Sequence, residues 1–219
     1  MNSFANEKLH QAFELITDID KEKVRNAVKN ARMANPLMSD LELATNFFDQ
    51  SRLKAAAAGF GLGVAGNPLA IVPSAIADIT ITTKTEVFAA ACAAETFHEG
   101  FLDSETARME LLVPVFGMGA MDQLAAELGI RAGKELTKDL IKKHLSKETL
   151  KQFKKIMLKY FGIKATQKGI ITKTLPIVGG FIGASWNAIE VSVMKNRVIK
   201  YLQADSQEVE VVSVVEEPN

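Results

Sequence analysis

Apolar positions in the first fifth of the chain recur at steps of three and four residues, the period of an amphipathic helix. One series comprises Leu9, Phe13 and Ile16, and a second runs through Val24, Val28 and Ala31. Asn35-Pro36 interrupts the pattern, because proline cannot continue a helix and restricts the residue before it. Ser39 followed by Glu42 has the spacing of a capping box, which predicts that the next helix begins here.

That second helix is expected to continue through Leu43, Phe47 and Leu53 into the alanines at 55–58. The glycine-rich run GFGLGVAG at 59–66 predicts a break or loosening, since each interior glycine costs about 1 kcal/mol relative to alanine. Asn67-Pro68 can start another helix, which we expect to reach Phe97. The ITITT run at 79–83 favours a strand by composition, but the alanines on both sides favour a helix.

Four further helices are predicted beyond residue 103. Asp103 or Ser104 can cap the first of them, in which Pro114 is expected to cause a kink. Residues 131–145 and 147–161 form two basic helices, and an apolar helix runs from about Pro176 to about Leu202. The predicted fold is therefore mainly α, a multi-helix bundle with apolar Gly/Ala-rich helices and no large sheet. We divide the chain into an N-terminal helical segment (1–50), a helical domain (51–203) and an acidic flexible tail (204–219).

Residues 55–77 form an uncharged stretch of 23 residues, and residues 174–189 form another of 16. A spanning helix needs roughly 20 apolar residues, but four glycines, Pro68 and Pro73 interrupt the first stretch. A buried hairpin or a re-entrant insertion therefore fits it better than a simple span. Two interpretations stay open: a helical core of a soluble protein, and a peripheral or partly inserted membrane protein.

The net charge of zero conceals a strong asymmetry along the chain. Residues 86–127 carry eight acidic and one basic side chain, for a net charge of −7, whereas residues 131–173 carry thirteen basic and three acidic ones, for +10. Residues 205–219 add five acidic side chains and no basic ones. This kind of asymmetry bears on the choice of partners.

The two basic helices are amphipathic, with lysines falling between apolar positions, and this pattern is typical of helices that bind an anionic membrane surface. A core helix with a solvated lysine face, or docking on an acidic protein partner, gives the same pattern. Nucleic acid is not expected, because lysine dominates over arginine and no binding motif is present. The candidate membrane or anion contacts are Lys142, Lys143, Lys151, Lys154, Lys155 and Lys159.

No sequence motif predicts catalysis. Gly61, Gly63 and Gly66 match the GxGxxG pattern, but the residues before them predict a helix where a dinucleotide site requires a strand. The three histidines lack metal-ligand spacing, and Cys92 among alanines is expected to be a small buried hydrophobe. We therefore assign no catalytic residue, no metal and no cofactor. An enzyme with an unrecognised site, around Asp78 and His98, is kept as an alternative.

Three segments together resemble the EcsC family: residues 54–91, residues 95–117 and residues 173–202. The last contains a Leu-Pro-x-x-Gly…Gly-Ala…Asn pattern like that of the family. The resemblance implies association with a membrane and a helical fold, with no catalytic residue to transfer. The characteristic positions that it implies here are structural, namely Asp78, Pro176, Gly179, Gly183 and Asn187.

These observations lead to an expected function. We expect a non-enzymatic, membrane-associated protein of bacterial origin at the cytoplasmic face, accessory to a membrane transport or secretion system. Its partners are expected to be an anionic membrane surface or a membrane protein, and a homo-oligomer is a further option. The N-terminal residues predict no secretory signal, and a single cysteine fits a reducing compartment. The main alternative is a soluble all-α adaptor that binds an acidic partner.

Overall fold

The protein is described by a computed structural model, and its described residues are 7, 10–11, 14–63, 71–104, 107–116, 155–156, 158–159, 189 and 191–203. Within these ranges the chain is helical between short turns, and no strand is present. The predicted mainly α class is therefore confirmed. The predicted acidic tail, most of the two basic helices and the start of the last apolar helix lie outside the described residues.

The first two long helices begin and end where local chemistry requires. Helix α2 (Lys21–Ala34) starts at Asp20, whose side chain accepts a hydrogen bond from the Lys23 backbone N–H at 2.9 Å. It ends immediately before Asn35-Pro36, as predicted. Helix α3 (Asp40–Gly63) begins with the predicted capping box. The Ser39 N–H and hydroxyl each donate to Glu42 at 2.8 Å, and the Glu42 N–H returns a bond of 3.3 Å to the Ser39 hydroxyl.

The capping box makes a prediction about pH. Hydrogen bonds from the Ser39 backbone and then from its hydroxyl lower the pKa of Glu42. The stabilisation from this carboxylate is thus present above its ordinary pKa and is lost as the pH falls through the lowered value. In Ser39→Ala the backbone donor remains and the hydroxyl is gone, so the pKa of Glu42 should rise part of the way to its ordinary value. An NMR pH titration measures this change, and an unaltered pKa in the variant contradicts it.

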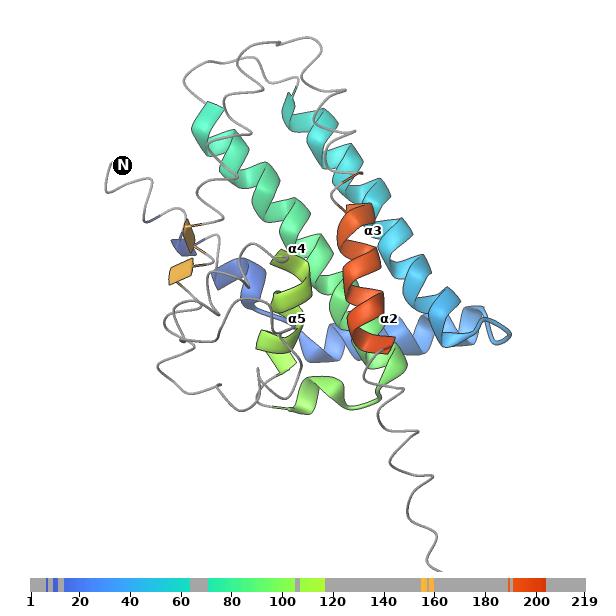
Figure 1. Ribbon diagram of the computed structural model, residues 1–219. Coiled ribbons are helices and arrows are strands. Elements are labelled where there is room, and N and C mark those ends of the chain that lie inside the picture. Colours follow the sequence, from blue (N-terminus) through green and yellow to red (C-terminus); the bar gives the residue numbers. More distant parts are fainter. Residues whose placement is uncertain are drawn as a thin grey trace, which may run out of the picture.

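Helix α4 (Ile71–Phe97) turns back along α3, and the two form a long antiparallel hairpin (Figure 1). The ITITT run lies inside α4, so the choice of helix over strand is confirmed. The expectation that the chain breaks from residue 59 onwards is wrong for its first part, because α3 continues through Gly59 and Gly61 to Gly63. Packing against α4 compensates the helix for the low propensity of these glycines.

The second half of α4 is the centre of the core. Every residue from 89 to 96 is buried, and six of them in succession are alanine or cysteine. A helix with such small side chains on every face lets its neighbours approach closely on all sides. Helices α2, α3 and α5 (Ala107–Phe116) all contact α4. Among the described residues, the largest fully buried side chain is Phe48, which α3 contributes.

A tight turn connects α4 to α5. Gly100 has a φ of 79°, a left-handed conformation that glycine adopts without strain, and it leads into the short 3-10 helix η2 (Phe101–Asp103). A further helix over residues 191–203, called here the C-terminal helix, packs its apolar face into the same core. Lys195 pairs with Asp49 of α3 at 3.3 Å, and Arg197 donates to the Val115 carbonyl of α5 at 3.2 Å. The C-terminal helix is thus tied to two different helices.

Candidate functional site

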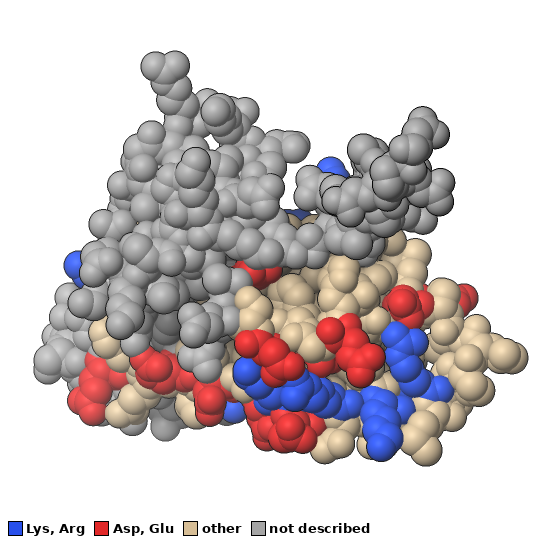
Figure 2. Space-filling view, turned by 90° about the horizontal axis from the view of Figure 1, so that it is seen from below, with Lys and Arg blue, Asp and Glu red and all other residues tan. Residues whose placement is uncertain are grey.

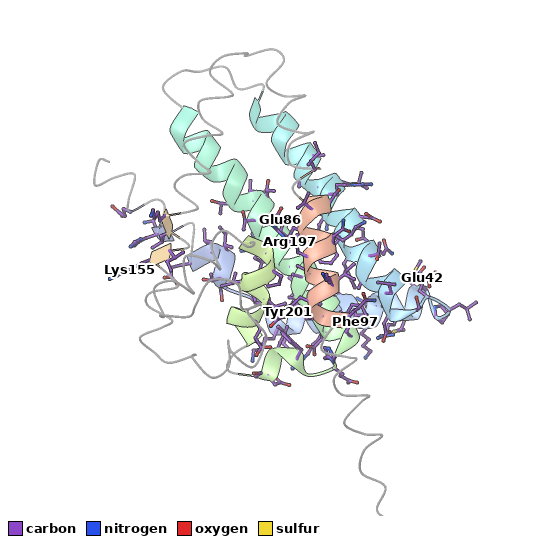
Figure 3. All side chains as sticks on the ribbon, viewed as in Figure 1. Glu42, Glu86, Phe97, Lys155, Arg197 and Tyr201 are labelled. Carbon is purple, nitrogen blue, oxygen red and sulfur yellow. The ribbon has the colours of Figure 1, made fainter. Side chains whose placement is uncertain are left out.

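The hairpin of α3 and α4 extends beyond the helices that pack against its base. Figure 1 shows α2, η2, α5 and the C-terminal helix gathered around one part of the hairpin, while its closed end stands away from them. We call the first part the body, and the uncharged residues 55–63 and 71–77 the hairpin end. In Figure 3, Glu86, Arg197, Tyr201 and Phe97 all lie in the body. The hairpin end is therefore the most separate element among the described residues.

One hydrogen bond fixes the register of the two hairpin helices. The Ser51 hydroxyl donates to the Thr85 carbonyl at 3.3 Å, which places residue 51 of α3 beside residue 85 of α4. Because the helices are antiparallel, rising numbers in α3 and falling numbers in α4 both lead toward the hairpin end. Any residue of either helix can therefore be placed by its distance from this level.

Burial along α4 shows where the hairpin leaves the body. Residues 89–96 are buried without exception, whereas Ile81 is 47% exposed and Lys84 is exposed. On α3 the buried positions recur at steps of three and four through Phe48, Ser51 and Ala55, while Leu53 is 69% exposed. Over residues 51–57 of α3 and 80–85 of α4, buried and exposed positions therefore alternate, so each helix has one buried face and one exposed face there.

The hairpin end is made of the uncharged stretch that the sequence singled out. Residues 55–63 complete α3 without a charge, and residues 71–77 begin α4 without one. At a rise of 1.5 Å per residue these arms are roughly 13 Å and 10 Å long. The helical backbone over both arms agrees with the predicted hairpin. No described helix meets the length and hydropathy that crossing a membrane would require.

Two of the six predicted lysine contacts are described. Lys155 and Lys159 are both exposed and both have helical backbone, and Lys155 is labelled in Figure 3. The other four lie outside the described residues: Lys142, Lys143, Lys151 and Lys154. Pro176, Gly179, Gly183 and Asn187, the implied family positions of the last apolar helix, lie outside them as well.

Asp78 and His98 do not form one site. Asp78 lies near the start of α4, and His98 follows its last residue, with its N–H donating to the Ala94 carbonyl at 2.8 Å. Twenty residues of helix separate them, a distance of about 30 Å at 1.5 Å per residue. The alternative of an enzyme with both residues in its site therefore loses its geometric basis.

A buried carboxylate holds the lower end of the body together. Glu95, with a side chain 5% exposed, accepts hydrogen bonds from the Gly100 N–H at 3.0 Å and the Leu102 N–H at 3.2 Å. Arg25 of α2 donates to the same carboxylate at 3.2 Å and pairs with Asp103 at 2.7 Å. The hydrogen bond from Arg25 lowers the pKa of Asp103. With three donors on Glu95, this network is a structural clamp between α2, α4 and the turn.

Sequence spacing gave no sign of this clamp, because Arg25 and Glu95 are 70 residues apart in the chain. The fold also shows how much of the acidic segment 86–127 lies on the surface. Three of its eight acidic residues, Glu86, Glu95 and Glu110, are buried, so they do not contribute to an acidic surface. On the end of the body shown in Figure 2, described lysines and arginines lie beside acidic residues. Part of the negative charge of segment 86–127 is thus inside the protein and not on its surface.

Cys92 is a buried hydrophobe, as predicted. Desolvation by burial raises the pKa of its thiol to about 12, so the reactive thiolate is suppressed at neutral pH. Within the described ranges, no cluster of His, Cys, Asp and Glu side chains has an arrangement that can hold a metal ion.

Comparisons with protein-family models, curated proteins and solved structures find no match for this chain.

Proposed function

We propose that this chain is a non-enzymatic protein that associates with the cytoplasmic face of a membrane by inserting its hairpin end into one leaflet. The observation that carries the proposal is the uncharged hairpin end standing beyond the body (Figure 1). The resemblance of three segments of the chain to the EcsC family favours a role accessory to a membrane transport or secretion system. The exposed lysines Lys155 and Lys159 are proposed as additional contacts with anionic lipid.

The dimensions of the hairpin end support a shallow insertion. The apolar face of an interfacial helix is buried about 5–10 Å into the boundary of head groups and acyl chains, and the uncharged arms are about 10 and 13 Å long. A helical hairpin satisfies backbone hydrogen bonds within its arms, as a lipid environment requires. The sequence of residues 55–77 is also rich in large apolar residues, among them Phe60, Leu62, Ile71 and Ile76.

An environment-sensitive fluorophore on the hairpin tests the proposal directly. Ala57 is the outermost residue of the α3 arm that is described as exposed, and the buried Cys92 thiol does not compete for a label. In Ala57→Cys carrying such a fluorophore, we expect a blue shift and increased intensity when vesicles are added. Lipids brominated on their acyl chains should quench it.

The matched control is Asn30→Cys, labelled in the same way at an exposed position of α2, on the body. Its fluorophore should remain in water under all conditions. If the Ala57 label also stays in water with both neutral and anionic vesicles, the proposal is wrong. Equal responses from both labels would indicate adsorption of the whole surface, and this result also contradicts insertion by the hairpin.

A specific observation favours a second candidate, the soluble adaptor. Large apolar side chains are exposed at the end of α2, in the connection and at the start of α3: Met33 (71%), Leu37 (98%) and Leu41 (43%). Exposed apolar side chains gathered at one place are typical of protein interaction sites. An adaptor that docks there is expected to stay in solution without detergent and to leave the Ala57 label unaffected by lipid, so the same experiment separates the two candidates.

A further inference from the structure

The hairpin end is bounded by three basic side chains from both of its helices: Arg52 and Lys54 of α3 and Lys84 of α4. All three are exposed. In the sequence they lie on either side of the uncharged stretch, 30 residues apart between Lys54 and Lys84, and only the hairpin brings them together.

The register places these cations at nearly one height. Counted from the level of Ser51 and Thr85, Arg52 and Lys84 are each one residue toward the hairpin end, and Lys54 is three residues toward it. Their Cα atoms therefore fall within about 5 Å of one another along the hairpin axis. Successive residues of a helix are about 100° apart, so Arg52 and Lys54 point in different directions around α3. The three side chains form a belt, which we call the cationic belt.

No described acidic residue forms an ion pair with the cationic belt. Several cations of the body do form ion pairs: Arg25 pairs with Glu95 and Asp103, Arg32 pairs with Asp40, and Lys195 pairs with Asp49. Between the belt and the uncharged arms lies one acidic residue, Asp78, seven residues from Thr85 and so about 10 Å from the reference level. The net charge of residues 52–84 is therefore +2, from three basic and one acidic side chain.

Exposed apolar side chains accompany the cations. Leu53 lies between Arg52 and Lys54, and Ile81 precedes Lys84 by three residues; they are 69% and 47% exposed. Apolar groups and cations at one level, below an uncharged end, match the order of layers in a bilayer with anionic head groups. An acidic protein surface would pair with the cations but would offer no apolar layer above them.

We infer that the cationic belt binds the phosphate groups of anionic phospholipids and sets the depth to which the hairpin end enters the leaflet. This inference rests on the proposed function and adds to it the class of lipid that the hairpin selects. Lysine and arginine near an anionic surface each strengthen binding about fivefold at moderate salt, so three of them together contribute on the order of 100-fold. Salt screens this contribution, but it does not screen the apolar insertion.

The test compares partitioning of the full chain into vesicles of phosphatidylcholine alone and of phosphatidylcholine mixed with phosphatidylglycerol. In the triple variant Arg52→Gln, Lys54→Gln, Lys84→Gln, partitioning into the mixed vesicles should fall on the order of 100-fold at low salt. Partitioning into phosphatidylcholine alone should be unchanged. The matched control, Lys23→Gln, Lys29→Gln, Lys200→Gln, removes the same charge from exposed positions on the body and should behave like the parent.

Each outcome has a separate meaning. If the Ala57 label never enters a bilayer, the proposed function fails, and the belt inference fails with it. If the label enters both kinds of vesicle and the belt variant prefers anionic lipid as strongly as the parent, only the belt inference is overturned. An equal loss in the body control would show a general effect of net charge and would also overturn it. Circular dichroism and thermal midpoints confirm that both variants are folded.

Discussion

In Glu95→Ala, we expect the free energy of unfolding to fall by about 2–4 kcal/mol, because two backbone N–H groups lose their acceptor. The Leu102 N–H lies in a buried part of the turn, and the Gly100 N–H lies beside it. Arg25 also loses a partner, but it keeps its ion pair with Asp103 and is one-third exposed. Its charge is therefore not left buried without a partner. Urea denaturation followed by circular dichroism measures the effect.

Two variants give the Glu95 prediction its controls. Glu22→Ala removes a carboxylate from the same arginine, but this pair is at 3.9 Å and the Glu22 side chain is 81% exposed, so no measurable change is expected. Glu95→Gln keeps an acceptor oxygen and should lie between the parent and Glu95→Ala. Equal stabilities for Glu95→Ala and Glu22→Ala would mean that the clamp contributes nothing.

In Phe48→Ala, we expect a loss of about 3–5 kcal/mol, since truncating a buried aromatic removes its transfer free energy and leaves a cavity. Phe48 is fully buried and is the largest such side chain among the described residues. It belongs to the part of α3 inside the body, so its loss loosens the base from which the hairpin extends. The midpoint of urea denaturation should fall with it.

Leu53→Ala is the matched control on the same helix. Leu53 is five residues further along α3 and is mostly exposed, so its truncation should leave the stability in solution nearly unchanged. A comparable loss in both variants would contradict the assignment of Phe48 to the core and of Leu53 to the open face of the hairpin.

Local signals in the sequence predicted the local features of the fold. The spacing of Ser39 and Glu42 found the start of α3, Asn35-Pro36 found the end of α2, and the alanines around residues 79–83 identified a helix. Each signal concerns a few neighbouring residues, whose preferences are largely their own. The cap at Asp20 was missed, although an aspartate ahead of an apolar helical repeat is a usable sign.

Features that depend on distant residues were not predictable in the same way. Three glycines in the last turns of α3 argued for a break, but contact with α4 outweighs their propensity. The acidic segment 86–127 suggested a surface charge, and only the fold shows that Glu86, Glu95 and Glu110 are buried. The cationic belt has the same origin, because the sequence gives no register between Lys54 and Lys84.

Because Cys92 is buried, the rate at which its thiol is modified measures how often the core opens. A thiol with a pKa of about 12, in the buried second half of α4, reacts only in molecules whose core has come apart. When closing is faster than the chemical step, the rate of thiol modification therefore reports the equilibrium between closed and open molecules. The free energy of opening can thus be calculated from the modification rate of Cys92, at native conditions and without denaturant.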